Sequence, residues 1–323
     1  MNVFLKFCFY HYFLPIIFIA AIVIPVALKQ YNLPEPVLEN AYRNEITSYN
    51  WVNTLDSVNG FILGASTLRY GLSASRLKTN DSLWVNFSMD ARDPLVCYLL
   101  LKQYYASKKP SVILFGLDPW IFSKRYYINE EKIMYLDLNA HETYSFLKLD
   151  KSVFFTKFRK LFDLYLSGNK KIKNDDSFTV PQDYGSVKLT EKAKNFDEIH
   201  NDWFEINKFH WSEIEFEYLL RIKDFCHKNN VKLVFIISPK RKDFRVWSET
   251  AFKHEHQEWW NKINDVIGGE YIIGKYSILD AQNQDSVFVE AFHLNKNGQK
   301  EFSVFVRNSL KSPGVITRDY SIF

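Results

Sequence analysis

Short apolar runs alternate with longer amphipathic stretches through most of the chain. The short runs have the length of buried strands and lie at 60–64, 83–87, 111–116, 232–238 and 271–273. The longer stretches carry apolar residues at helical spacing and lie at 67–77, 94–107, 211–228, 248–267 and 295–310. Because strands that alternate with helices pair in parallel, the pattern predicts an α/β fold with three layers, α/β/α, around a mainly parallel five-stranded sheet.

A different pattern opens the chain, where residues 7–28 are almost entirely apolar and lie between Lys6 and Lys29. As a helix this stretch would be about 33 Å long, enough to cross a bilayer. Pro15 and Pro25 fall within it, and proline is tolerated in membrane spans. A cleaved signal peptide is the competing interpretation. Since no small-x-small cleavage site follows the apolar run, we predict one uncleaved transmembrane helix, with the remaining chain outside the cytoplasm.

These patterns divide the chain into four parts. Residues 1–32 form the membrane anchor, and 33–59 form a stalk with a docking helix. Residues 60–312 form the α/β domain, which carries an insertion at about 124–209, where the alternation of strand and helix is interrupted by polar sequence. Residues 313–323 are a C-terminal tail.

Composition narrows the classes of partner. Of the 323 residues 47% are hydrophobic, which allows a sizeable core, and 41 Lys and Arg stand against 37 Asp and Glu. The positive charges are interspersed with negative ones, so nucleic acid is not expected as a partner. Cys97 and Cys226 lie in apolar helical patterns and are expected to be buried thiols, with a single disulfide as the alternative.

Ser66 lies where the first predicted strand gives way to a helix, in Gly-Ala-Ser-Thr at 64–67. In parallel α/β sheets, reactive groups gather at the carboxyl ends of the strands. The first backbone N–H groups of a helix have no intrahelical partner and can stabilise an oxyanion. Ser66 is therefore a candidate nucleophile, and the alternative is a serine that only caps the helix.

A carboxylate and an imidazole lie just before the last predicted helix. Glu290 and His293 are three residues apart, a spacing that lets the carboxylate hold the imidazole in one tautomer, as a serine-activating base requires. The alternative is a helix cap beside a surface histidine.

Taken in order, these segments resemble the SGNH (GDSL-like) hydrolase superfamily. The resemblance rests on four spaced blocks, at 63–66, 86–88, 115–119 and 290–295. Within the superfamily the chain looks most like the membrane-anchored branch that includes D-alanyl-transfer and alginate O-acetylation proteins.

This resemblance implies roles for particular residues. Ser66 would be the nucleophile, His293 the base and Glu290 the acid that orients it, although the family usually has Asp there. Glu290 is one methylene longer, so Asp280 is an alternative acid.

The resemblance also implies an oxyanion site or pocket made by Ala65, Thr67, Asn86 and Asp118. Here the chain departs from the family, because the third block commonly ends in Asn-Asp and this chain has Asp118-Pro119. An ionised Asp cannot donate to an oxyanion and would repel it. Asn86 can supply a donor if its side chain points inward.

The expected activity is that of a serine-dependent O-acyltransferase or esterase that acts on O-acyl groups of a cell-envelope or exported polysaccharide. The resemblance implies a multispanning O-acyltransferase as a partner. The alternative is a non-catalytic protein that binds or assembles envelope polysaccharide.

We expect no cofactor and no metal. His254 and His256 are two apart on a predicted helix, so they face different sides, and we interpret them as exposed.

Overall fold

The computed structural model describes residues 47–78, 83–90, 92–123, 180–190, 211–268, 271–274 and 277–311. The chain divides into two compact units. One comprises Met1–Ser48 and Ile128–Ser177, and the other comprises Tyr49–Tyr127 and Phe178–Phe323. Nearly all of the described residues belong to the second unit, which contains the sheet.

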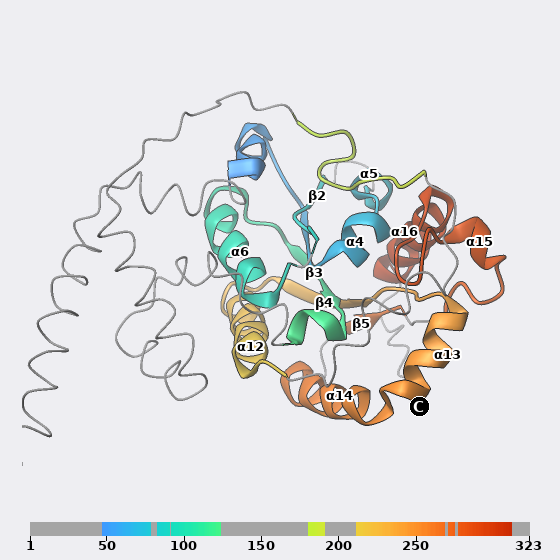
Figure 1. Cartoon of the computed structure of the whole chain (residues 1–323). Helices are drawn as coiled ribbons and strands as arrows, with labels where there is room; N and C mark the ends of the chain where they lie inside the picture. Colours follow the sequence, from blue (N-terminus) through green and yellow to red (C-terminus); the bar gives the residue numbers. More distant parts are fainter. Residues whose placement is uncertain are drawn as a thin grey trace, which may run out of the picture. The chain divides into compact units, whose positions relative to one another are not determined.

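Five parallel strands form that sheet, in the order β2-β1-β3-β4-β5 (Figure 1). This confirms the predicted α/β architecture with its five-stranded parallel sheet. The bounds of the strands lie within two residues of the predicted runs. They are β1 (Gly60–Leu63), β2 (Trp84–Asn86), β3 (Val112–Leu117), β4 (Lys232–Ile237) and β5 (Tyr271–Ile273).

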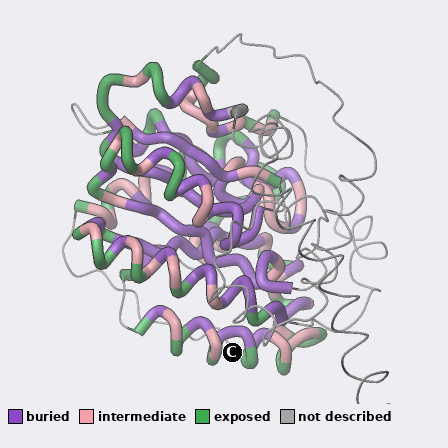
Figure 2. The backbone as a smooth tube through the Cα atoms, turned by 90° about the vertical axis from the view of Figure 1, so that its left-hand side faces the viewer, coloured by how far each residue is buried: buried purple, intermediate pink, exposed green. Residues whose placement is uncertain are grey.

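Both faces of the sheet are buried, which explains why its strands are almost continuously apolar. Successive side chains of a strand point to opposite faces. Ile62, Leu114 and Val234 lie in register and share a core with α4 (Ser66–Gly71), α5 (Ala74–Leu77) and α16 (Lys296–Lys311). Apart from the first residues of β3, β4 and β5 the strands are buried, and Figure 2 shows a buried interior surrounded by segments that alternate between buried and exposed residues.

The other face of the sheet is covered by α6 (Pro94–Lys108), α12 (Glu213–Lys228) and α14 (Lys253–Ile267), on the opposite side of the sheet from α4, α5 and α16 in Figure 1. Aromatic rings dominate this layer. The Phe122 ring lies 4.8 Å from Phe216 of α12 and 6.3 Å from Trp259 of α14, between ring centroids. Helices therefore lie on both faces, as the three-layer prediction requires.

The helix expected over 67–77 is broken into α4 and α5. Leu72 is extended, with φ −118° and ψ 136°, and the break is held by long-range hydrogen bonds. The backbone N–H of Ser73 donates to Ser303 Oγ at 2.9 Å, and that of Ala74 donates to Ser186 Oγ at 3.0 Å. Because these acceptors come from distant parts of the chain, the local pattern does not reveal the break.

The helix expected over 248–267 is also two helices, α13 (Lys242–Ala251) and α14. Phe252 lies between them with φ −127° and ψ 31°. The first helix begins six residues earlier than predicted, at Lys242, shortly after the end of β4. Consequently α13 lies beside the loop that carries Glu290 and His293, a position that the sequence pattern did not indicate.

Residues 180–190, from the predicted insertion, form a strap on this unit. Gly185 has φ +95°, and a Cβ there would lie 2.2 Å from the Asn86 carbonyl oxygen, so only glycine fits this approach. The strap is joined to β2, α4 and α16 by backbone hydrogen bonds from Asn86 N–H to Tyr184 O (2.9 Å), Val187 N–H to Arg69 O (3.1 Å) and Lys296 N–H to Leu189 O (3.0 Å).

The predicted membrane span at 7–28 lies outside the described residues. Within the described ranges, no helix is both long and apolar enough to cross a bilayer. The end of the predicted stalk is described as a 3-10 helix, η2 (Thr47–Thr54). Its Tyr49, Trp51 and Val52 are buried, so this part of the stalk packs as part of the domain.

Candidate active site

Ser66 is the first residue of α4 and follows the carboxyl end of β1 after a turn of two residues. The turn between them is tight, because a Cβ on Gly64 would lie 3.3 Å from the backbone nitrogen of Gly116 on β3. The backbone N–H groups of Leu68 and Arg69 donate to the Ala65 carbonyl. Those of Ser66 and Thr67 precede the intrahelical pattern and are the groups that such a turn offers to an oxyanion.

Glu290 and His293 lie in the loop between α15 (Gln284–Val287) and α16. The loop is closed by an antiparallel bridge between Phe288 and Leu294 and by the Val289 N–H, which donates to the His293 carbonyl at 2.9 Å. Within it the Glu290 carboxylate contacts Nδ1 of His293. This contact fixes the tautomer in which Nδ1 carries a proton and leaves Nε2 as the basic nitrogen.

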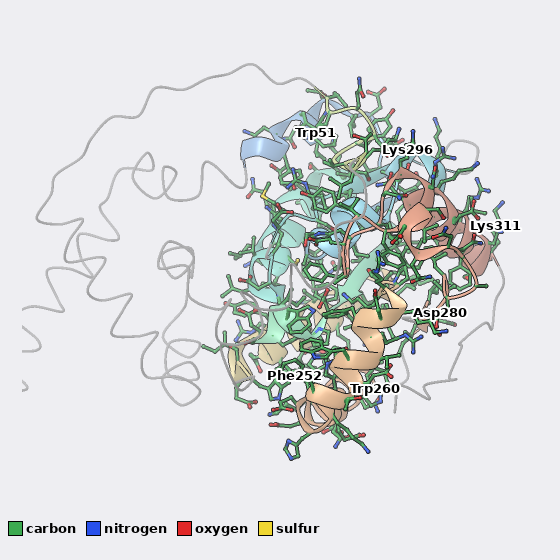
Figure 3. All side chains as sticks on the ribbon, turned by 45° about the vertical axis from the view of Figure 1, so that its right-hand side comes forward. Trp51, Phe252, Trp260, Asp280, Lys296 and Lys311 are labelled. Atoms are coloured by element: carbon green, nitrogen blue, oxygen red, sulfur yellow. The ribbon has the colours of Figure 1, made fainter. Side chains whose placement is uncertain are left out.

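Nε2 of His293 is buried and has no hydrogen-bond partner among the described residues. Most buried polar atoms are hydrogen-bonded, so an open one next to a fixed Nδ1 marks a candidate base. The alternative acid is Asp280, which is labelled in Figure 3. It is engaged elsewhere, because its carboxylate pairs with Arg245 of α13.

Tyr70 brings the histidine and serine segments together. It lies four residues after Ser66 on α4, hence on the same face of that helix. Its ring centroid is 5.0 Å from that of His293, at an interplanar angle of 78°. Burial, and then the Asp90 carboxylate, raise the pKa of Tyr70. The Tyr70 hydroxyl donates to Asp90 at 3.3 Å, so the phenol stays protonated against the imidazole.

Asn86 is fully buried and its side chain is engaged within the protein. Its amide nitrogen donates to the Leu68 carbonyl and to Ser186 Oγ, both at 3.1 Å, and its Oδ1 accepts the Ser88 N–H at 2.9 Å. Both amide hydrogens of Asn86 are thus engaged in bonds that hold α4 and the strap against β2. Asn86 supports the helix that carries Ser66, and its donors are not directed at a substrate.

Asp118 follows the carboxyl end of β3 and pairs with a lysine that the sequence patterns did not single out. Lys240 Nζ donates to Asp118 Oδ2 at 2.9 Å, and the two side chains are only 5% and 4% exposed. The other carboxylate oxygen, Oδ1, accepts the Trp120 N–H at 3.3 Å. The negative charge of Asp118, expected to repel an oxyanion, is therefore accompanied by a positive one.

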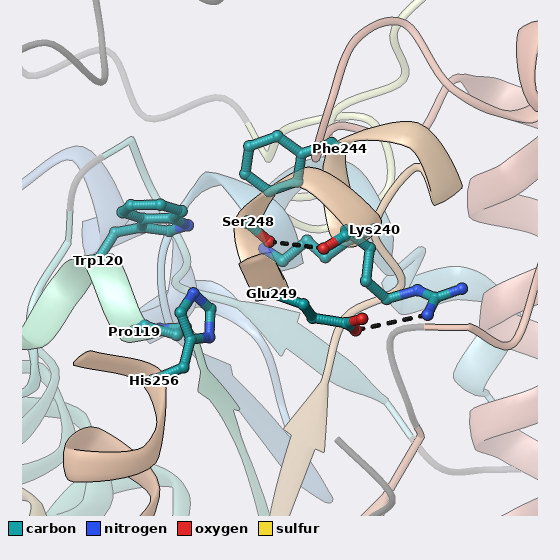
Figure 4. A pocket seen from close by; sticks show the side chains of 8 residues that line it. Pro119, Trp120, Lys240, Phe244, Ser248, Glu249 and His256 are labelled. Carbon is teal, nitrogen blue, oxygen red and sulfur yellow. Dashed lines mark hydrogen bonds and ion pairs between the residues drawn. The ribbon is translucent and has the colours of Figure 1, made fainter. Parts of the chain in front are cut away.

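A cavity of about 10 Å³, enough for about one water molecule, lies beside this ion pair. Figure 4 shows its wall, to which α13 contributes Phe244, Ser248 and Glu249 and α14 contributes His256. His256 is only 7% exposed, contrary to the expectation of a surface residue. His254 is exposed, so the prediction that the two histidines face different sides is confirmed.

Burial lowers the pKa of His256 to about 4. The unfolded chain, with a histidine pKa near 6.5, binds a proton that the folded protein does not accept until pH 4. Stability from this group is complete above pH 6.5 and is lost as the pH falls towards 4. We expect the free energy of unfolding to fall by about 2 kcal/mol between pH 7 and pH 5 through His256 alone.

Urea unfolding at the two pH values measures this loss. The variant His256→Leu should show about 2 kcal/mol less pH dependence than the wild type, and His254→Leu, at the exposed position on the same helix, should retain the wild-type dependence. If His256→Leu kept the wild-type pH dependence, burial of His256 would not be its cause.

The structure brings Glu290 to His293 and packs His293 against the helix that begins at Ser66. Ala65 and Thr67 are buried on either side of Ser66. Sequence reasoning missed Tyr70 and Lys240. A tyrosine four residues after a candidate nucleophile was a usable signal, whereas nothing local marks Lys240, which lies 122 residues from its partner.

No protein-family model matches this chain, and no curated protein matches it. Two solved structures are similar to it at 10% sequence identity. A protein from Streptococcus pneumonia assigned as a platelet activating factor matches with a TM-score of 0.45 over 88% of this chain and 99% of its own. A lipase/acylhydrolase from Enterococcus faecalis matches with a TM-score of 0.39 over 78% of this chain and 95% of its own. The roles of Ser66 and His293 are inferred from the contacts described above.

Proposed function

We propose that this chain is a membrane-anchored, SGNH-like acyltransferase or esterase that acts on O-acyl groups of a cell-envelope or exported polysaccharide through Ser66 and His293. One observation carries the chemical part of the proposal. Glu290 holds Nδ1 of His293, while the buried Nε2 of the same ring is left without a partner among the described residues. The apolar run at 7–28 supports the membrane anchor, and a multispanning O-acyltransferase is the partner that we propose for the chain.

In this mechanism Ser66 Oγ attacks the acyl carbonyl carbon and its proton passes to Nε2 of His293. The carbonyl electron pair moves onto oxygen and forms an oxyanion near the start of α4. When the tetrahedral intermediate collapses, the leaving alcohol takes the proton from Nε2 and the acyl group remains on Ser66. A sugar hydroxyl or water then attacks the acyl carbon and gives its proton to Nε2 of His293. When this second intermediate collapses, Ser66 leaves and takes the proton back.

Covalent labelling with a fluorophosphonate tests the nucleophile. We expect the wild type to be labelled at Ser66, as mapped by mass spectrometry of peptides, and Ser66→Ala to lose the label entirely. Ser107→Ala, at an exposed position on α6, is the matched control and should be labelled at the wild-type rate. Label that persists in Ser66→Ala would assign the reactivity to another residue.

A wild type that takes no label would instead favour the non-catalytic protein that binds or assembles polysaccharide. If Ser66 is labelled, an acyl donor supplied with and without an oligosaccharide acceptor separates the two activities. An acyltransferase will transfer the acyl group to the sugar, and an esterase will release it to water in both cases.

A further inference from the structure

The carboxyl ends of β1, β3 and β4 lie side by side, which places the residues that follow them along one edge of the sheet. Leu63 pairs in register with Phe115, and Leu117 pairs with Ile237. Ser66 and Asp118 each come three residues after the Leu63–Phe115 pair. Neighbouring strands are about 4.8 Å apart, so Asp118 follows the strand next to the one that presents Ser66.

Asp118 cannot stabilise an oxyanion at this edge. An ionised carboxylate has only acceptors, and both of its oxygens are already bonded, to Lys240 and to the Trp120 N–H. At 3% exposure its charge is poorly screened by water. A negative charge in this place opposes the reaction unless a positive charge accompanies it.

Lys240 supplies that positive charge between Asp118 and the histidine loop. Its ammonium reaches across from the end of β4 to Asp118 and lies 5.7 Å from the centroid of the Phe292 ring. The Phe292 ring is in turn 4.6 Å from the His293 ring. The next residue, Arg241, donates its backbone N–H to the Ala291 carbonyl at 2.9 Å, so the Lys240 turn is fixed directly to the loop that carries His293.

We propose that Lys240 stabilises the oxyanion formed when Ser66 attacks an acyl carbonyl. Its ammonium would serve as the side-chain donor at the end of β3, where Asp118 itself cannot donate. An ammonium has three N–H donors and can serve Asp118 and a second acceptor at once. Asp118 orients the ammonium, and no proton leaves Lys240 during the step. The Ser66 proton passes to His293, and the carbonyl electron pair becomes the oxyanion. This inference rests on the proposed serine acyl transfer.

Two double variants separate donation from charge neutralisation. Asp118→Asn/Lys240→Met and Asp118→Leu/Lys240→Met both remove the ion pair and leave neutral side chains of similar size. Only the first offers an N–H donor at the end of β3. The readouts are kcat and KM for hydrolysis of a nitrophenyl acetate ester, with thermal unfolding to compare the folded state.

We expect the Asn double variant to retain kcat within about tenfold of the wild type, and the Leu double variant to fall about 10²–10³-fold below it at similar KM. Asp118→Ala/Lys240→Met also lacks a donor and should behave like the Leu variant. It replaces the Leu variant in the comparison if that protein does not fold. A kcat within about tenfold of the wild type in the donor-free variants would overturn the role of Lys240.

The same assay distinguishes this failure from failure of the proposed function. If the wild type shows no turnover that is lost in Ser66→Ala, the serine mechanism fails and the inference fails with it. If the wild type turns over through Ser66 and the donor-free variants turn over at a similar rate, only the role of Lys240 is refuted.

Discussion

Exchange of His293 for Gln is expected to lower the rate at which Ser66 reacts with a fluorophosphonate by about 10³-fold. The glutamine amide cannot take the serine proton at Nε2, so Ser66 would react only as an unassisted alcohol. Time-resolved labelling of the full chain measures the rate. The matched control is His254→Gln, at an exposed position on α14, which should react at the wild-type rate.

Glu290 variants test how the base is held. Glu290→Gln can present its amide to Nδ1 and so favour the wrong tautomer, which should lower the rate nearly as far. Glu290→Asp restores the residue usual in the family but withdraws the carboxylate by one methylene from a ring placed for Glu. We expect Glu290→Asp to be slower than the wild type. A wild-type rate in both Glu290 variants would show that the Glu290–His293 contact has no part in activating Ser66.

Lys240→Met is expected to lower the free energy of unfolding by about 3–5 kcal/mol, because it leaves the buried Asp118 carboxylate without its counter-charge. The pair is only 5% and 4% exposed, so water cannot replace the lost partner. Removal of both charges in Asp118→Asn/Lys240→Met should recover most of this loss, since two neutral side chains have no charge to desolvate. Urea unfolding of the three proteins measures the effect.

An exposed ion pair provides the control for this stability series. Lys262 Nζ lies 2.6 Å from a Glu213 oxygen, but these side chains are 31% and 49% exposed. Lys262→Met should therefore change stability by less than about 1 kcal/mol. If Lys240→Met were equally mild, the Asp118 carboxylate would have to be stabilised by groups other than the ammonium.

The sheet was predictable because its strands are buried on both faces, so that each appears as a continuous apolar run such as 232–237. The start of a helix also depends on neighbouring residues. Asp93 accepts the Val96 N–H at 3.0 Å at the start of α6, where Pro94 occupies the first helical position. The break after Gly71 was not predictable, because Ser303 and Ser186 hold it from more than 100 residues away.

The candidate site shows the same division between local and distant information. Ser66, Glu290 and His293 could be proposed because each lies in a short block at a recognisable position. Ser66 follows the first strand, and the other two precede the last helix. Asp118 was placed correctly at the end of the third strand, but its ion pair with Lys240 and the resulting change in local charge were not predicted. The partner that changes it, Lys240, follows a different strand, and only the parallel pairing of β3 with β4 brings the two together.

The predicted insertion is not a detachable module, although the described residues on its two sides lie next to each other. Ser123 and Trp211 form an antiparallel bridge, and the Ser212 N–H donates to the Phe122 carbonyl at 2.8 Å. Direct joining of Ser123 to Trp211 would close the chain easily but would delete the strap at 180–190. The edge strand β2 would lose the hydrogen bond from the Asn86 N–H to the Tyr184 carbonyl, and the hydrogen bonds that join the strap to α4 and to the first turn of α16 would be lost as well. The eleven residues at 180–190 therefore belong to the packing of the domain itself.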